Sequence, residues 1–423
     1  MKKSLIIILN LLLILSFASF GYAVEEYVYV TKWTPNGNPR SIATDEDGNV
    51  YAAGEQTIMK YTSEGALVFT IQNIPNNDDY NLSSWDMAVA VDSSGYIYVS
   101  NEQGHNVVKF DSTGSYVTKW GSQGSDDDQF NEPKGIAISN GYVYVCDRGN
   151  YRIVKFDIDG TFISSFGQEG WEDGMFQRPM NIAIDSTNSE IYVTEEWNQR
   201  IQVFDLDGIF QRKWATDSSA GDGEATDIRG IAIDSQGNVY VSDEKWMNNK
   251  IVKFASDGTF ILKWGGYGTD NYHFDGLQGI AIDYSDNVYV VDNQNWDWQN
   301  RRILKYRLMG SPTIQITNPT ENQFLTGTVT IQATVSVLSG YTISEVEFYL
   351  GDNKLGETTS PPNTIENFPY DWDTTASTNG AYTIWVVATN TEETASREKV
   401  SIVVANGDAA PTVSITEPTD QEQ

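Results

Sequence analysis

The stretch Gly230–Asp243, "GIAIDSQGNVYVSD", contains two short runs of alternating apolar residues around a glycine-containing turn. Alternation with a period of two is typical of β-strands, and a glycine that can adopt positive φ permits a tight hairpin. The chain repeats this phrase five more times. The other copies are "SIATDEDGNVYAAG" from Ser41, "AVAVDSSGYIYVSN" from Ala88, "GIAISNGYVYVCD" from Gly135, "NIAIDSTNSEIYVTE" from Asn181 and "GIAIDYSDNVYVVD" from Gly279.

The copies follow one another at a nearly fixed period. One tyrosine marks each copy, and successive tyrosines are 47, 46, 48, 48 and 49 residues apart. The six are Tyr51, Tyr98, Tyr144, Tyr192, Tyr240 and Tyr289. In the fifth copy "KIVKF" (250–254) and "TFILKW" (259–264) add two more predicted strands. Four antiparallel strands make one propeller blade, which cannot bury both faces alone, so the copies are expected to pack around an axis.

The sixth copy lacks a fourth strand before the sequence changes at Gly310. The missing strand has a counterpart near the N-terminus, because "VYVTKW" at Val28–Trp33 matches the fourth strand "SYVTKW" at Ser115–Trp120. We therefore predict that the N-terminal strand completes the last blade. Such closure would remove the unpaired edges that favour aggregation.

The segment "WGSQGSDDDQFNEPKGIAIS", Trp120–Ser139, followed by "YVYVCDRGNYRIVKFDIDGTF", resembles the NHL repeat. The resemblance extends from Tyr27 to Tyr306 and implies a six-bladed β-propeller, which we assign to residues 24–310. The first copy departs from the pattern, because "AAGEQTIMKY" lacks the Asp and Arg of "CDRGNYRI".

The N-terminus has the layout of a secretory signal peptide. Lys2 and Lys3 precede an apolar run from Leu5 to about Leu15, and small residues follow as far as Ala23. We predict that residues 1–23 are removed after Ala23 and that the protein is secreted or displayed on the cell surface. No apolar run reaches the roughly 20 residues that a membrane-spanning helix needs.

The region after Gly310 predicts a second all-β domain. Its runs "VEFYLGDNKLGE", "FPYDWDTT" and "GAYTIWVVATN" resemble bacterial Ig-like domains of surface proteins, which commonly act as spacers, and we assign residues 311–406 to such a β-sandwich. Residues 407–423 are predicted to be a linker and the first strand of a second such domain, because "APTVSITEPTDQEQ" echoes "SPTIQITNPTENQF".

The charge and the cysteine content argue against some classes of ligand and chemistry. With 27 basic and 58 acidic side chains the net charge is −31, which argues against binding to nucleic acids or anionic lipids. Cys146, the single cysteine, occupies a strand position that holds Ser, Thr or Val in sister copies, so we expect a buried structural residue.

Tryptophans supply the candidate binding residues. Trp33, Trp120, Trp214 and Trp264 share one fourth-strand position and are expected to pack between blades. Six others fall in loops that the repeat alignment places on one face. They are Trp85, Trp171, Trp197, Trp246, Trp296 and Trp298. Exposed indoles are favoured contacts for proteins and stack on sugars, whereas the alternative interpretation is that they fill gaps between blades.

Acidic residues supply the candidate metal ligands. A carboxylate or amide ends each second strand from the second copy onward, and a basic residue starts the third strand in most copies. The acidic candidates are Asp147, Glu195, Asp243 and Asp292, with His273 in a loop of the same face, and the basic residues are Arg152, Arg200, Lys250 and Arg302. We interpret the recurring pairs mainly as ion pairs that clamp loops. Several carboxylates around one axis could also hold Ca²⁺ through oxygen ligands.

These features leave two main function classes. The first is a secreted or surface recognition module that binds an extracellular protein or glycan through its aromatic loops. The alternative is a metal-dependent lyase or lactonase with a site at the propeller axis, as in some zinc lyases among six-bladed relatives. His105 and His273 are the only histidines, fewer than a His-rich zinc site requires, and no nucleophile, phosphate-loop or dinucleotide motif is present. A purely structural surface-coat protein is a third interpretation.

Overall fold

The computed structural model describes residues 27–406, except 73–81, 83, 85, 246–247, 294–300, 309, 338–340, 352, 359–364 and 392–394. Regular structure in these residues is β-strand, apart from three short 3-10 turns. The turns are η1 (Arg148–Asn150), η2 (Ser218–Gly223) and η3 (Thr374–Ala376). No helix in this described part is long and apolar enough to cross a membrane. The predicted signal peptide and the predicted start of a further domain lie outside the described residues.

Six antiparallel four-stranded sheets are built from residues 27–308. Sheet 1 contains β2 (Ser41–Thr44), β3 (Val50–Gly54), β4 (Thr57–Tyr61) and β5 (Leu67–Gln72), and sheet 2 contains β6 (Met87–Val91), β7 (Ile97–Asn101), β8 (Asn106–Phe110) and β9 (Tyr116–Trp120). Sheet 3 contains β10 (Pro133–Ser139), β11 (Tyr142–Asp147), β12 (Arg152–Asp157) and β13 (Phe162–Phe166), and sheet 4 contains β14 (Pro179–Asp185), β15 (Glu190–Glu195), β16 (Arg200–Asp205) and β17 (Phe210–Ala215). Sheet 5 contains β18 (Ile228–Ile233), β19 (Val239–Asp243), β20 (Lys250–Phe254) and β21 (Phe260–Gly265), and sheet 6 contains β22 (Leu277–Ile282), β23 (Val288–Asp292), β24 (Arg302–Leu308) and β1 (Tyr27–Trp33).

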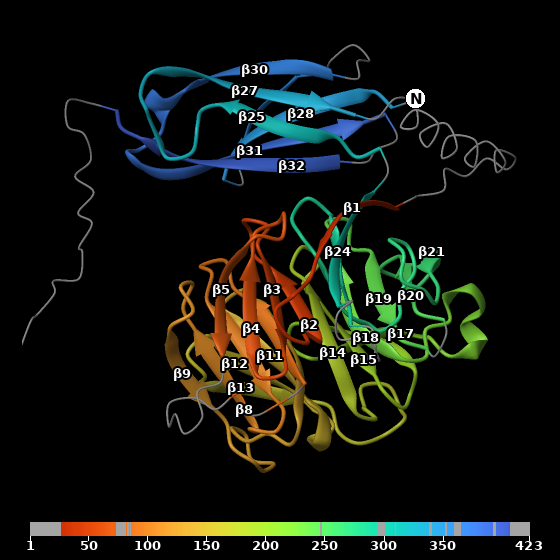
Figure 1. The fold of residues 1–423 in the computed structure, drawn as a ribbon. Helices are drawn as coiled ribbons and strands as arrows, with labels where there is room; N and C mark the ends of the chain where they lie inside the picture. The colour runs from red at the N-terminus through yellow and green to blue at the C-terminus, as the bar shows by residue number, and fades with distance from the viewer. Residues whose placement is uncertain are drawn as a thin grey trace, which may run out of the picture.

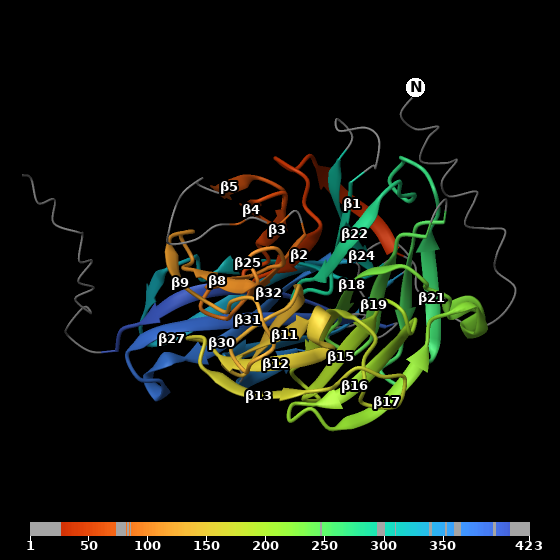
Figure 2. The same cartoon turned by 90° about the horizontal axis from the view of Figure 1, so that it is seen from below.

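The six sheets form a propeller-like ring (Figure 2). The first strand of each sheet contacts the first strand of the next, in the order β2, β6, β10, β14, β18 and β22, and β22 contacts β2 again. The ring closes through the N-terminal strand, because β1 pairs with β24 over Tyr27↔Leu308 to Trp33↔Ile303 (Figure 1). This is the pairing expected from the match between Val28–Trp33 and Ser115–Trp120.

Fourth-strand aromatic side chains wedge neighbouring sheets together. A Cβ placed on Gly258, a turn residue of sheet 5 with φ +89°, would lie 2.5 Å from the ring of Trp214 in sheet 4. Equivalent contacts join Trp33 to Gly65 and Trp120 to Gly160. The positive φ and the close indole together require glycine in these turns. This packing confirms the framework role expected for these tryptophans.

A second unit follows the ring and consists of two sheets. The three-stranded sheet contains β25 (Thr313–Asn318), β27 (Thr328–Ser336) and β30 (Ile365–Asp373). The five-stranded sheet contains β26 (Gln323–Leu325), β32 (Ala395–Val404), β31 (Gly380–Asn390), β28 (Ile343–Leu350) and β29 (Asn353–Thr358). Both sheets contribute to one apolar core, with Ile331 and Phe368 from the first and Phe348 and Ile384 from the second. Alternating burial along β27 explains why its sequence reads as a half-buried strand.

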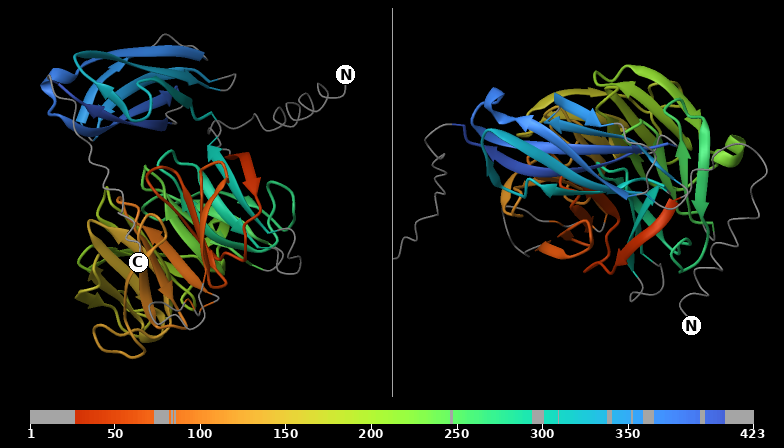
Figure 3. Two further views of the ribbon diagram at one scale, coloured as in Figure 1. Left: turned by 60° about the vertical axis from the view of Figure 1, so that its left-hand side comes forward. Right: turned by 90° about the horizontal axis from the view of Figure 1, so that it is seen from above.

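The second unit lies over one end of the ring (Figures 1 and 3). Its main contact is with the turn between β22 and β23. The Tyr284 ring stacks on Trp385 with centroids 6.1 Å apart, and the Arg397 guanidinium lies 4.3 Å from the Tyr284 ring centre. The Ser285 hydroxyl donates to the Arg397 carbonyl at 2.6 Å, and Lys399 pairs with Asp47 at 2.7 Å. The contact therefore combines stacking, hydrogen bonding and charge.

Candidate functional site

The ring has two ends with different chemistry. The turns between first and second strands lie at one end, which we call the turn face, and the second unit contacts this end. The first strands begin at the other end, where the loops between second and third strands and the connections between sheets also lie. We call it the loop face, and it is the face on which the sequence places the candidate tryptophans.

The turn-face opening is the larger of the two axial cavities, at about 580 Å³. Its rim is acidic, but these carboxylates maintain the fold. Asp45 caps its own turn by accepting from the Asp47 and Asn49 amides and also accepts from the Tyr51 hydroxyl at 2.9 Å. Asp234 and Asp283 accept from tyrosines of their own sheets in the same way. This opening therefore has few carboxylates free for a ligand.

The loop-face opening is a small cavity of about 110 Å³ where the first strands begin. Glycines set its width. A Cβ on Gly135 would lie 2.7 Å from the backbone of Asn181, and one on Gly230 would lie 2.8 Å from the backbone of Ile280. Since neighbouring first strands approach so closely, the side chains that precede these glycines surround the axis.

Three cations and one carboxylate are the charged residues that line this cavity within the described part of the chain. Arg40 pairs with Asp86 at 3.1 Å, and Lys134 pairs with the same carboxylate at 2.9 Å. Burial by itself would raise the pKa of Asp86, but Lys134, Arg40 and Arg229 oppose this and hold the pKa below its ordinary value. A carboxylate is thus stably ionised among the three cations.

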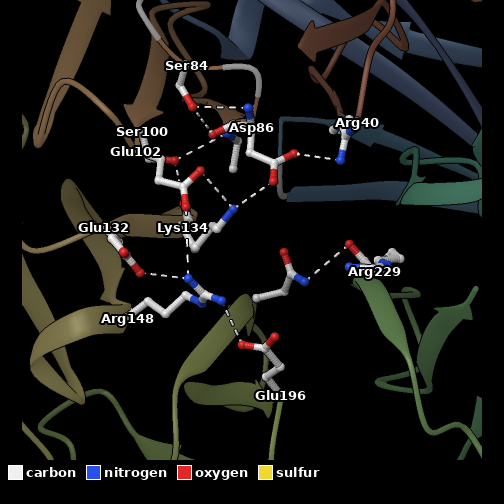
Figure 4. Close-up of polar contacts among 12 residues, drawn as sticks. Arg40, Ser84, Asp86, Ser100, Glu102, Glu132, Lys134, Arg148, Glu196 and Arg229 are labelled. Atoms are coloured by element: carbon white, nitrogen blue, oxygen red, sulfur yellow. Dashed lines mark hydrogen bonds and ion pairs between the residues drawn. The ribbon is translucent and has the colours of Figure 1, made fainter. Parts of the chain in front are cut away.

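A belt of ion pairs extends from this cavity across sheets 2, 3 and 4 (Figure 4). Lys134 also contacts Glu102 at 3.0 Å. Arg148 lies between Glu132 at 2.7 Å and Glu196 at 2.8 Å, and both carboxylates are shared with Arg178. The belt therefore links the axis to the loops of sheet 4.

Two of the six candidate tryptophans lie in the described residues, and both are exposed at the loop face. Trp171 is 66% exposed and Trp197 is 53% exposed. The Arg178 guanidinium lies 5.1 Å from the centre of the Trp197 ring, so the outer end of the belt supports this indole from one side. The remaining candidates, Trp85, Trp246, Trp296 and Trp298, lie outside the described residues.

The candidate metal ligands are engaged separately, each in its own sheet. The carboxylates of Asp147, Glu195, Asp243 and Asp292 are buried, and each pairs with the basic residue of the next strand at 2.5–2.8 Å. Arg152 illustrates the role, because it bonds Asp147 and also donates to the Asp126 and Gln129 carbonyls of the preceding loop. Burial raises the pKa of Asp147 and of Asp292. These pairs behave as loop clamps.

The described residues bring no metal-binding group together from the candidate ligands. In this part of the chain, one group of three His, Cys, Asp or Glu residues has its ligand atoms close enough together to hold a metal ion. The group lies in the second unit and consists of Glu345, Glu347 and Glu357. Lys354 already pairs with two of these carboxylates. His273 is hydrogen-bonded to Asp270 at 2.8 Å, and a Ca²⁺ or zinc site stays a prediction.

The axial cations were not predicted from the sequence. Arg40, Lys134 and Arg229 stand directly before the "SIAT", "GIAI" and "GIAI" phrases of their copies. Their equivalents in the other copies are uncharged, so a search for features shared by all six copies passes over them. The sequence does contain a signal for these cations, because the residue before the first-strand phrase is charged in the first, third and fifth copies and uncharged in the others.

Two family descriptions match the chain. The NHL repeat matches residues 130–156, and the bacterial Ig domain matches residues 312–386. Both matches confirm the resemblances seen in the sequence. None of the curated proteins compared with the chain matches it.

Several solved structures are similar to the chain at low identity. A streptogramin B lyase is 17% identical, with 67% of this chain and 98% of that chain covered and a TM-score of 0.48. A catalytically inactive virginiamycin B lyase from Staphylococcus aureus, with quinupristin, is 15% identical, with 74% and 96% covered and a TM-score of 0.46. A chain of a nidogen/laminin complex is 16% identical, with 57% and 84% covered and a TM-score of 0.43.

Proposed function

We propose that the chain is an exported recognition protein whose six sheets are the blades of an NHL propeller. The loop face of the propeller binds an extracellular protein or glycan, and the second unit is an Ig-like sandwich that supports it. Export rests on the predicted signal peptide, with cleavage after Ala23 and domain limits at 24–310 and 311–406.

The observation that carries this proposal is the exposure of large indoles on the loop face. Trp171 and Trp197 expose more than half of their surface, which is costly for side chains of this size unless they meet a ligand. Their flat faces suit sugar rings or apolar protein side chains, and Trp is frequent among the residues that dominate binding energy.

The position of the sandwich supports the same assignment. It contacts the turn face through Tyr284 and Asp47, so the loop face stays accessible. The carboxylates that the alternative lyase or lactonase would need at the axis are instead used in ion pairs such as Asp147–Arg152 and Asp292–Arg302. These uses favour recognition over metal-dependent catalysis.

Capture experiments on the full chain test the proposal. The protein is applied to a glycan array and used in pull-down experiments with extracellular proteins, with wild type compared with Trp171→Ala and Trp197→Ala. Loss of an interface hot spot costs about 2 kcal/mol or more, so we expect binding to weaken by roughly 30-fold or more. Ile163→Ala is the matched control, because Ile163 is an exposed apolar residue of the outer strand β13. Unchanged capture by both tryptophan variants, with circular dichroism like that of wild type, would refute the role of these indoles.

A further inference from the structure

The more exposed of the two described indoles belongs to the connection between sheets 3 and 4. Residues 167–177 contain Trp171, which is 66% exposed, together with three acidic residues and no Lys or Arg. Lys213 pairs with one of these acids, Asp173. The other two, Glu169 and Glu172, are exposed and belong to none of the ion pairs in the described part of the chain. An open aromatic ring is therefore flanked in the sequence by two carboxylates without a counter-ion.

Arg200 fixes the loop that carries Trp171. Its guanidinium donates to the Trp171 carbonyl at 2.9 Å and to the Glu172 carbonyl at 3.1 Å. Glu195, the buried partner of Arg200, accepts from the Gln177 amide at 2.7 Å, at the end of the same loop. Because the loop backbone is bound at several points, a partner that contacts it loses less conformational entropy than it would in ordering a free loop.

The loop of Trp197 is tied to the end of the Trp171 loop, because the Glu196 amide donates to the Arg178 carbonyl at 3.1 Å. The two indoles differ in what already contacts their rings. The Arg178 guanidinium lies 5.1 Å from the centre of the Trp197 ring, whereas within the described residues no cation lies over the Trp171 ring. Trp171 is therefore the indole that can accept a cation from a partner.

The cations around these two loops already have carboxylate partners. Arg148 and Arg178 share the carboxylates of Glu132 and Glu196, at distances from 2.7 to 3.4 Å. An anionic ligand would have to displace one of these carboxylates to reach either guanidinium. A cationic ligand needs no such exchange, since Glu172 is available beside the exposed indole.

The connections between sheets give the loop face one sign of charge. The segments 121–131, 167–177, 216–227 and 265–275 together contain twelve acidic residues and no Lys or Arg. The whole chain has a net charge of −31. Such a surface attracts a basic partner and speeds its association, whereas it repels an acidic one. Charge complementarity therefore favours a cationic partner for this face.

We propose that the loop face of sheet 4 binds a basic segment of an extracellular protein, with a Lys or Arg side chain of that segment on the Trp171 ring and Glu169 and Glu172 as its counter-ions. The inference rests on the proposed recognition function and names the partner class. A cation over an indole is attracted by the electrons of the ring, and a nearby carboxylate adds a charge-assisted hydrogen bond. A neutral glycan would use the indole and leave both carboxylates without a role, so its binding is a competing outcome of the test.

The test measures binding of the full chain to matched pairs of peptides. One member of a pair carries Lys or Arg in a background of glycine and serine, and the other carries acetyl-lysine or citrulline at the same positions. Neutral oligosaccharides are included. The salt concentration is about 0.15 M, at which exposed charges more than about 8 Å apart are largely screened. We expect the basic member to bind roughly tenfold or more tightly than its neutralised partner, since the cation–π contact and the ion pair are lost together.

Variants assign the preference for basic peptides to Trp171. Trp171→Ala should weaken their binding about tenfold, and Trp171→Phe should retain part of it. The double variant Glu169→Gln, Glu172→Gln should weaken it roughly fivefold. Asp257→Asn is the control for net charge, because Asp257 lies in the turn between β20 and β21, which antiparallel pairing places at the turn face, and Asn can still accept from the Thr259 amide. The substituted side chains are exposed, so the variants are expected to fold, which circular dichroism checks.

The outcomes separate this inference from the proposed function. Equal binding of both members of every pair would overturn the cation site, and so would a loss of binding in Trp171→Ala no greater than that in Asp257→Asn. Capture of a neutral glycan that depends on Trp171, without binding of basic peptides, would overturn the inference and leave recognition intact. Capture of glycans or proteins that neither Trp171→Ala nor Trp197→Ala changes would refute the proposed function itself.

Discussion

Arg397→Ala should release the second unit from the ring. The guanidinium contacts the ring of Tyr284 at 4.3 Å and that of Trp385 at 5.2 Å, and its Nε donates to the Tyr284 carbonyl. Each cation–π contact contributes roughly 0.5–1 kcal/mol when partly exposed, and a hydrogen bond from a charged donor adds about 1.5 kcal/mol at its lower limit. The two cation–π contacts and the hydrogen bond together contribute about 3 kcal/mol. Replacing Arg397 by alanine also removes the cost of desolvating a partly buried charge, which offsets part of this loss. We expect a net loss of about 2 kcal/mol, or roughly 30-fold in the docking equilibrium.

Small-angle scattering and hydrogen exchange on the full chain measure this release. The variant should show a larger radius of gyration and faster amide exchange at the turn 284–286, while the exchange of β31 and of the first strands stays at the wild-type level. Lys354→Ala is the matched control, because Lys354 is a cation of the same second unit and pairs with Glu347 and Glu357. Scattering and exchange indistinguishable from wild type in Arg397→Ala would show that this side chain does not hold the two units together.

Two further predictions concern the ring. Gly258→Ala should lower the free energy of unfolding by about 2 kcal/mol or more, because its Cβ would meet the Trp214 ring and its φ is positive. Gly141→Ala, at φ +77° with open space around it, should lower the free energy of unfolding by only about 1 kcal/mol. Urea titration of both variants measures the difference, and equal losses would contradict the close packing of Trp214 on Gly258. Cys146 should not react with thiol reagents at pH 8 until the protein unfolds, since burial raises its pKa and keeps the thiol protonated, so labelling at the rate of a free thiol in native protein would contradict this.

The repeated framework could be predicted from the sequence because its physical requirements recur in every copy. Tyr240 and its equivalents are buried in all six sheets, and the turn glycines require a conformation that other residues seldom adopt. The closing strand was predictable for the same reason, since Val28–Trp33 has the sequence of a fourth strand and one copy lacked it. In each case the pattern itself carries the structural information.

Contacts between different parts of the chain could not be predicted in this way. Arg397 and Tyr284 are 113 residues apart and belong to different repeat systems, so no periodicity relates them. The clamp role of Asp147 was predicted from its recurring partner Arg152, whereas the shared use of Glu132 by Arg148 and Arg178 depends on how adjacent sheets are placed. Sequence periodicity describes one four-stranded sheet, whereas these contacts depend on how neighbouring sheets or units are placed relative to one another.

The axial position shows where a repeat protein departs from its own framework. Where every copy needs a large buried side chain, as at Tyr240, all six copies retain the same residue, so such a position is explained by folding. Where the copies differ at a position that faces a shared cavity, contacts made by single copies supply the reason. Arg40 and Lys134 meet this condition, because they pair with Asp86 at the start of sheet 2 from the two neighbouring sheets, whereas Met180 occupies the equivalent place without interrupting the ring. A variant with methionine at both positions should therefore keep the ring but unfold at a lower urea concentration than wild type, since the partly buried carboxylate of Asp86 loses these two partners. An unchanged urea midpoint would show that these ion pairs do not stabilise the ring.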